Sequence, residues 1–231
     1  MTVMTAGRVA ARRFTTSSNR QSALPQPCSS PGVRGAGLVA PCEALQDPDR
    51  TMLGAAQEKW LLDGLARAQP VWTLIAQQTM FAPLGIGSSE PGASIWSDLW
   101  DGYPRSRTAI TEAMARNSIR NAVILSGDVH SCWVNDVNRN AADPSSPKVA
   151  TEIVTTCLAS RNAPESLFAN ARRDNRHVRF MDNAHSGYVL LDLDRKRLTA
   201  RFRTVTDLTH DTAACETLAT FEIEDRTVVR T

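Results

Sequence analysis

Residues 121–133 read NAVILSGDVHSCW, and the interpretation of the fold begins with them. The continuous apolar run VIL before a glycine indicates a short strand that is buried on both faces. Asp128 and His130 follow at once and stand two residues apart, so in an extended backbone their side chains leave on the same side. Because open α/β sheets gather functional groups at the carboxyl ends of strands, we expect both to lie at one sheet edge and point into one cavity.

Each of the two residues also has an ordinary structural interpretation. An aspartate after a strand often accepts hydrogen bonds from the backbone of a turn or helix terminus. A single histidine is often a partly exposed or core side chain. Carboxylate and imidazole are, however, both metal ligands, so Asp128 and His130 are a candidate metal site with a capped turn as the alternative.

Composition describes an ordinary globular protein of one or two domains. The 231 residues are 42% hydrophobic and 22% charged, with a formal net charge of +2. Basic and acidic residues are interspersed, which gives no indication of a nucleic-acid partner. No apolar stretch is long enough to predict a transmembrane segment.

Cysteine spacing argues against a zinc finger. The five cysteines, at positions 28, 42, 132, 157 and 215, contain no C-x-x-C pair. Only Cys28 and Cys42 are close enough in sequence to suggest a local bridge, and their pairing cannot be deduced from the sequence.

The first 41 residues differ in character from the rest of the chain. No acidic residue precedes Glu43, whereas arginines are scattered among Ser, Thr, Pro and Gly without a period. The composition is similar to that of a transit peptide, but no apolar signal region follows ARRF at 11–14. We expect residues 1–41 to be disordered or an aberrant start, and residues 42–231 to form the folded domain.

The folded part alternates helices and strands before it becomes all strand. An α/β pattern is expected first, followed by an antiparallel meander. The expected helices are 55–68 and 106–117, and the expected strands are 71–78, 121–127, 149–160, 186–194, 197–205, 218–225 and 227–230. A long loop rich in Gly, Ser and Pro spans 82–104.

Several segments together carry a family resemblance. LGAAQEKWLLDGLARAQPVWTLIAQQTMFAPL, WDGYPRSRTAI, VILSGDVHSCW, VATEIVTTCLAS and NAHSGYVLLDLD follow one another in the order and spacing of the carboxy-terminal half of the alkaline phosphatase D family. The resemblance covers roughly residues 42–205. It implies a metallophosphatase-like fold, in which two mixed β-sheets pack as a sandwich flanked by helices, present here in part.

The resemblance also implies an activity. Members of the family hydrolyse phosphodiesters and phosphomonoesters of small molecules, lipids or polymers at a dinuclear centre of Fe³⁺ and Ca²⁺, and are periplasmic or secreted. By resemblance, Asp128 and His130 are metal ligands of the catalytic centre. Such a centre clamps phosphate oxygens and activates water for attack.

This chain departs from the family pattern in its amino-terminal part. The family's remaining ligands, a cysteine, a tyrosine, further aspartates and an asparagine, belong to motifs without a counterpart here, and Cys28 and Cys42 lie in the wrong context. The competing hypothesis is therefore a catalytically incomplete module with a folding or interaction role. A site with only Asp128 and His130 falls short of the three protein ligands usual in catalytic metal sites.

Four further residues are candidates near the site. Trp100, Asp101 and Tyr103 are expected at the active-site mouth, with the alternative that Trp100 and Tyr103 pin their loop to the core. Glu152 lies in a strand, where it either hydrogen-bonds a metal-binding histidine or is an exposed edge charge.

The other histidines and the cysteine of the motif have simpler interpretations. His177, His185 and His210 show no acidic or histidine partner at ligand spacing, which favours surface or packing roles. Cys132 is interpreted as a small buried side chain.

Overall fold

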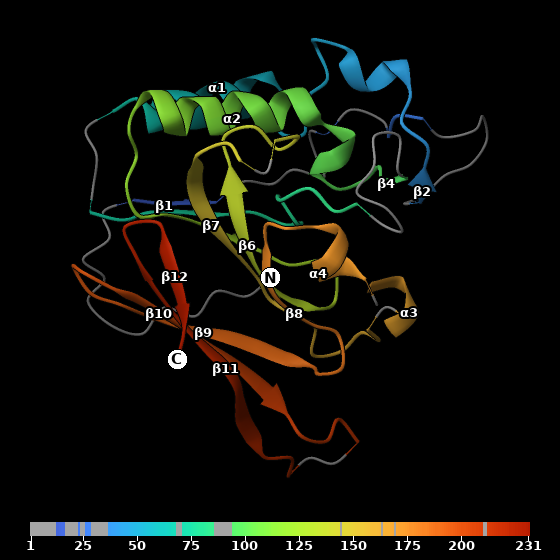
Figure 1. The fold of residues 1–231 in the computed structure, drawn as a ribbon, viewed down its shortest axis with the longest axis vertical. Coiled ribbons are helices and arrows are strands. Elements are labelled where there is room, and N and C mark those ends of the chain that lie inside the picture. The colour runs from blue at the N-terminus through green and yellow to red at the C-terminus, as the bar shows by residue number, and fades with distance from the viewer. Residues whose placement is uncertain are drawn as a thin grey trace.

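The chain folds into three layers, with helices on one sheet and a second sheet on its other face (Figure 1). This computed structural model describes residues 13–16, 23, 26–28, 37–67, 71–85, 94–143, 145–162, 164–168, 170–209 and 212–231. The layered arrangement confirms the predicted sandwich flanked by helices.

The central sheet has six strands in the order β1-β3-β5-β7-β6-β8. The first four, β1 (Arg13–Thr16), β3 (Thr73–Ala76), β5 (Ala122–Ser126) and β7 (Lys148–Val154), run parallel. Strand β6 (Cys132–Asn138) is antiparallel to both β7 and β8 (Val178–Asp182). All five residues of β5 are buried, as its continuous apolar run predicts.

Two helices cover one face of this sheet. The apolar residues of α1 (Ala55–Leu65) and α2 (Pro104–Arg116) recur at helical spacing, and α2 begins with a proline whose fixed φ suits a first turn. Leu61, Ile110 and Met114 pack there with Ile75 and Ile124 of the sheet. Within the described part of the chain, none of the helices combines the length and apolar character that a bilayer crossing requires.

The other face packs against the antiparallel sheet β12-β11-β10-β9. Its strands are β9 (Gly187–Leu193), β10 (Leu198–Val205), β11 (Cys215–Glu224) and β12 (Thr227–Arg230). Phe180 of β8 meets Phe202 and Phe221 between the sheets, with ring centroids 5.2–5.8 Å apart. Burial of a phenylalanine contributes about 2–3 kcal/mol, so these rings help to fix the sheets face to face.

Short elements complete the fold at the periphery. They are β2 (Leu38–Val39), β4 (Ile95–Trp96), the 3₁₀ turns η1 (Glu43–Gln46) and η2 (Trp100–Gly102), and α3 (Glu165–Phe168) and α4 (Ala171–Asp174). Cys28 and Cys42 form a disulfide with a Cα–Cα distance of 5.5 Å, which is the pairing that their spacing suggested. In η2, a Cβ on Gly102 would lie 2.0 Å from the Ser97 carbonyl oxygen, so the turn needs glycine there.

The expected disorder of residues 1–41 falls mostly outside the described residues. Among the few residues of this segment that the structure describes, Arg13–Thr16 pairs in parallel with β3, and Leu38 and Val39 pair with β4. The expectation for the segment as a whole stays a prediction. Strand pairing supplies backbone hydrogen bonds whatever the side-chain composition, which is why an acid-free segment without a period can join a sheet.

Most of the expected helices and strands are confirmed with small shifts at their ends, but the strand expected over 149–160 already ends at Val154. Strands β6 and β8 were missed. β6 carries Asn135 and Asp136 in its middle and so lacks an apolar pattern, whereas β8 alternates only over Val178, Arg179 and Phe180, which is too short to stand out.

Candidate functional site

The carboxyl ends of four strands meet at one edge of the central sheet. Strand β8 runs in the same direction as β3, β5 and β7, because two successive antiparallel pairings restore the direction. Backbone bonds join the neighbouring ends: Gln77 N donates to Leu125 O at 2.9 Å, and Thr155 N donates to Ser126 O at 3.0 Å. This edge is where the chain presents Asp128 and His130.

The loop that carries them is not extended. Asp128 has φ 76° and His130 has φ 53°, both in the left-handed region. The premise that an extended backbone directs the two side chains to one side is therefore wrong. The chain bends here because β6 does not pair with β5, so the loop must pass the end of β7 to reach its position. Asp and His tolerate this region better than most residues, and such strain is concentrated at functional sites.

An apolar residue anchors the middle of this loop. Val129 packs against the cluster that contains Trp133, while Asp128 is exposed and His130 is partly exposed. The Trp133 indole donates to Ser131 Oγ at 2.6 Å and holds the far end of the loop. Both polar residues thus lie at the sheet edge as expected, and their convergence on one cavity stays a prediction.

The ring of His130 is oriented by a backbone carbonyl. Its Nδ1 lies 2.9 Å from the oxygen of Arg161. A carbonyl can only accept, so Nδ1 carries the hydrogen and the lone pair is on Nε2. Histidines that bind metals commonly donate from the other ring nitrogen to a carbonyl in this way.

A second imidazole lies at the same edge, after β8. His185 Nδ1 is 3.0 Å from Asp182 Oδ1, and the His185 backbone N also donates to that oxygen at 3.1 Å. The expectation that His185 has no acidic partner is wrong, because D-x-x-H after an unrecognised strand brings the two together. The D-x-x-H spacing is the sequence signal from which this pair could have been predicted. The expected packing role holds for His177, and His210 lies outside the described residues.

The segment after β7 links the two histidine loops. Thr156 Oγ1 donates to His185 O at 3.1 Å, and Asn162 Nδ2 donates to Asn183 O at 2.8 Å. Since the neighbouring Arg161 contacts His130, residues 156–162 bridge the β5 and β8 loops into one unit.

The side chain of Glu152 has no exposed surface and makes its hydrogen bonds inside the fold, below this edge of the sheet. Its Oε1 accepts from Phe81 N at 2.6 Å and Ser126 Oγ at 2.5 Å. Its Oε2 accepts from Ala82 N at 2.9 Å and Asn135 Nδ2 at 3.0 Å. Burial raises the pKa of Glu152 in spite of these donors.

Neither expectation for Glu152 is met. The side chain is not an exposed edge charge, and these four donors include no histidine. It instead joins the segment after β3 to the sheet, and holds Ser126 two residues before Asp128.

The loop that follows β4 is anchored to the core by Trp100, Asp101 and Tyr103, as in the second interpretation of Trp100 and Tyr103. All three are buried, at 2%, 8% and 2% exposure. The Trp100 indole donates to Gln77 Oε1 at 3.0 Å. Arg107 forms an ion pair with Asp101 at 2.6 Å, and Leu84 N donates to the other carboxylate oxygen at 2.8 Å.

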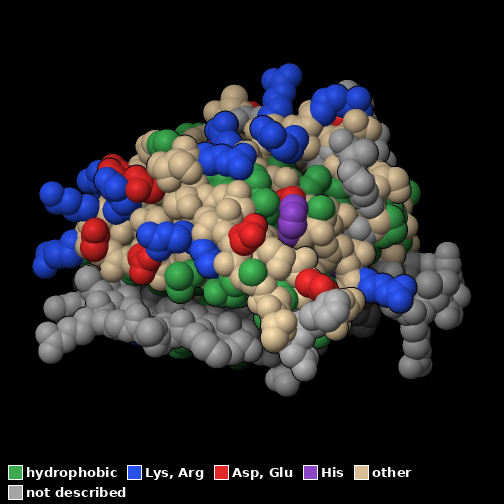
Figure 2. All heavy atoms as spheres, turned by 90° about the horizontal axis from the view of Figure 1, so that it is seen from below, with side chains coloured by type: hydrophobic (Ala, Val, Ile, Leu, Met, Phe, Trp, Pro, Cys, Tyr) green, Lys and Arg blue, Asp and Glu red, His purple; other side chains and the backbone are tan. Residues whose placement is uncertain are grey.

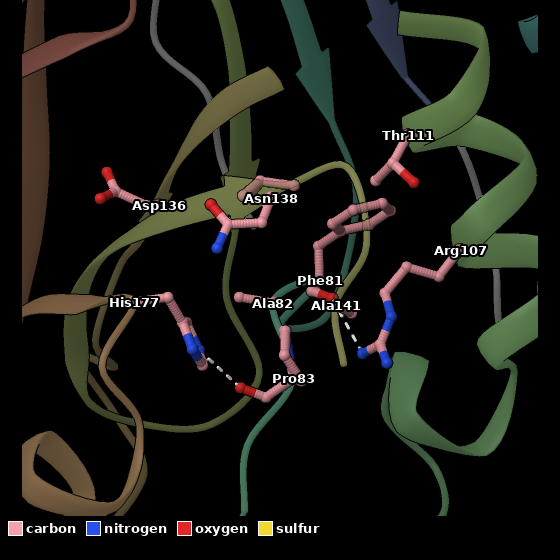
Figure 3. A pocket seen from close by; sticks show the side chains of 10 residues that line it. Phe81, Ala82, Pro83, Arg107, Thr111, Asp136, Asn138, Ala141 and His177 are labelled. Carbon is pink, nitrogen blue, oxygen red and sulfur yellow. Dashed lines mark hydrogen bonds between the residues drawn. The ribbon is translucent and has the colours of Figure 1, made fainter. Parts of the chain in front are cut away.

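The cavity in Figure 3 lies away from this edge, against α2, the end of β6 and the 81–83 segment. The cavity has a volume of about 20 Å³, which is enough for one water molecule. His177 lines it and lies 2.8 Å from the Pro83 carbonyl oxygen through Nε2. Neither Asp128 nor His130 lines the cavity, so this cavity is not the one into which the two residues were expected to point.

The residues described here do not complete a metal site. Among them, no group of three or more His, Cys, Asp or Glu side chains is arranged to hold a metal ion. Cys132 is buried as expected, and burial, with Asp182 nearby, raises the pKa of its thiol to about 12. A protonated thiol is a poor ligand, and the role of Asp128 and His130 as metal ligands stays a prediction.

Comparisons with known proteins agree with this fold. The family model of the PhoD-like phosphatases matches residues 11–202. Alkaline phosphatase D of Bacillus subtilis (strain 168) is 31% identical over 199 residues, which are 84% of this chain and 34% of that protein. A solved structure of PhoD matches with a TM-score of 0.83 and 28% identity, over 94% of this chain and 41% of that one. The chain thus spans about a third of the length of this curated relative.

Proposed function

This chain belongs to the PhoD-like phosphatase family, and on that premise we propose that Asp128 and His130 form one side of a metal-dependent centre for phosphoric ester hydrolysis. The observation that carries the proposal is the orientation of His130. Its Nδ1–H is held by the Arg161 carbonyl, which leaves Nε2 to bind a cation.

The proposed reaction is the attack of water on a phosphoric ester. The bond from phosphorus to the water oxygen forms, the bond to the leaving oxygen breaks, and a proton from water passes to the leaving alcohol. Bound cations, Fe³⁺ and Ca²⁺ by family resemblance, would supply charge neutralisation and a more acidic water. In this chain, Asp128 contributes a hard oxygen ligand with one negative charge and His130 contributes a neutral nitrogen ligand.

The substrates we propose are phosphodiesters and phosphomonoesters. We also propose a periplasmic or secreted location. The Cys28–Cys42 disulfide supports it, because structural disulfides persist in oxidising compartments.

A second candidate function is a non-catalytic folded or interaction module. The incomplete ligand set among the described residues favours it. Two unit positive charges repel each other by about 4 kcal/mol at 4 Å for an effective dielectric of 20, and Fe³⁺ and Ca²⁺ held by one carboxylate would repel about six times more strongly. On that ground we expect metal binding to be weak and turnover to be slow compared with a full-length relative.

Metal content and ester hydrolysis of the purified chain distinguish the two functions. Elemental analysis after loading with Fe³⁺ or Ca²⁺ is compared with hydrolysis of bis(p-nitrophenyl) phosphate for the wild type and Asp128→Asn. The enzyme proposal expects weak binding and slow hydrolysis that are both lost in the variant.

Asp225→Asn is the matched control. Asp225 is also an exposed aspartate in the left-handed region, with φ 41°, but lies in the β11–β12 turn. Wild-type protein without metal or turnover would support the non-catalytic module, and two tightly bound metals with fast turnover would show that ligands have been missed.

A further inference from the structure

Strand β9 is an open edge of the four-stranded sheet. It pairs with β10 on one side and is the last strand in the sheet order. Val205 N donates to Ser186 O and Asp194 N donates to Arg197 O, each at 2.9 Å. In an antiparallel ladder this places the backbone groups of Tyr188, Leu190 and Asp192 toward β10.

The intervening residues Val189, Leu191 and Leu193 therefore direct their N–H and C=O groups away from the sheet. In the described part of the chain no hydrogen bond joins these groups to another residue. At the start of the strand, Gly187 N donates to Cys157 O at 3.0 Å. Beyond Gly187, the strand is a template for another strand.

The side chains of β9 favour pairing as well. Val189, Leu191 and Leu193 pack against the core between the sheets but are only partly buried, so the core is open at this edge. On the other face, Tyr188 and Leu190 are 43% and 45% exposed. Hydrophobic surface between charged side chains is also visible on the face in Figure 2.

Two other edge strands, β8 and β12, differ from β9. Proteins usually protect sheet edges with charges, prolines, bulges or short strands. Edge strand β8 carries Arg179 and Asp182 in five residues, and β12 has only four residues and ends at Arg230. In the seven residues of β9 the single charge is Asp192, which forms an ion pair with Arg201 of its own sheet.

We propose that β9 pairs antiparallel with β9 of a second copy of this chain, about a two-fold axis at Leu191. In this register Leu191 faces the partner's Leu191, and Val189 faces the partner's Leu193. Every outward N–H and C=O group of these three residues then finds a partner. The three apolar side chains of each copy close the open edge of the core in the other.

Charges are compatible with this symmetric register. Asp192 faces the partner's Leu190 and not a second aspartate, so no like charges are opposed. A two-fold interface places the same surface on both copies, which the self-complementary register allows. The proposal goes beyond the phosphatase function and is independent of it.

Sedimentation across a concentration series tests the proposal on the intact chain. Val189→Pro removes an outward donor next to the axis without breaking a bond to β10, and proline is tolerated at such edge positions. By symmetry it removes one hydrogen bond donor from each copy. We expect a reversible wild-type dimer and a dissociation constant at least about 30-fold higher in the variant.

Val228→Pro provides the matched control on the opposite edge. Thr231 N donates to Thr220 O at 3.1 Å, which fixes the ladder of β12 so that the Val228 N–H also points off the sheet. Val228, like Val189, is partly buried against the core between the sheets. We expect Val228→Pro to leave the dimer unchanged.

Hydrogen exchange of the wild type supplies a readout that needs no variant. The amides of Val189, Leu191 and Leu193 should become protected as the protein concentration rises. A wild type that stays monomeric up to millimolar concentration would overturn the proposal. So would a dimer that survives Val189→Pro, or β9 amides that exchange fast in the dimer.

Discussion

Replacement of Glu152 by glutamine tests how the candidate site is supported. The carboxylate accepts hydrogen bonds from the backbone N–H groups of Phe81 and Ala82, one on each oxygen. Protonation leaves a lone pair on both oxygens, so the neutral acid can still accept both bonds, whereas in Glu152→Gln one of these oxygens becomes an NH₂ group. Whichever way the amide turns, one buried backbone donor then faces another donor.

The expected cost is the desolvation of one unsatisfied donor. That is about 2 kcal/mol, which should lower the urea midpoint at pH 4.5 without a change in the slope. The pH dependence has a defined sign. Because burial raises the pKa of Glu152 above its ordinary 4.5, the folded protein holds this proton to higher pH than the unfolded chain.

The stability that Glu152 adds over glutamine is therefore full below pH 4.5 and decreases as the pH rises through the folded-state pKa. Urea unfolding of both proteins between pH 4 and 8 measures the difference. Glu216→Gln, in the exposed first part of β11, controls for loss of a glutamate. A difference that widens with pH would show that the donors outweigh burial, and equal stability at pH 4.5 would refute the hydrogen-bond assignment.

Three further predictions concern other parts of the fold. Replacement of both Cys28 and Cys42 by serine should cost about 3 kcal/mol, because the bridge closes a loop with a sequence separation of 14, and thermal unfolding with and without reductant measures it. Asp101→Asn should cost about 3 kcal/mol in urea unfolding, since it leaves the buried guanidinium of Arg107 without its counter-charge; stability close to wild type would contradict the buried pair. The Cys132 thiol, with its pKa of about 12, should resist alkylation at pH 8 until the protein unfolds, and mass spectrometry of the labelled peptide detects an exception.

The two helices and strand β5, which leads into the candidate site, could be predicted from the sequence because those features are local. The helical spacing of α1 and α2 and the apolar run of β5 each lie within one segment, and the structure confirms all three. The position of Asp128 and His130 at the sheet edge follows directly from the end of that strand.

What the sequence did not reveal depends on contacts between distant segments. The donors to Glu152 from Phe81 and Ala82 lie 71 and 70 residues earlier, so no local pattern could predict that a strand acid is fully buried and satisfied. The pairing of Asp182 with His185 was local, but its relevance depends on β8 being a strand at all. The left-handed backbone at Asp128 follows from sheet order, which local patterns do not encode.

The sheet order also dictates when the candidate site can form during synthesis. Strand β6 follows the Asp128 loop directly, yet both of its neighbours, β7 and β8, come later in the chain. A ribosome adds about 5–20 residues per second, so Cys132 emerges seconds before Asp182, its partner in the ladder. Until then the loop has a fixed strand on one side only. A pause in translation between residues 138 and 178 would leave β6 with unpaired edges, and the nascent chain would be most vulnerable to misfolding and to chaperone capture in that interval.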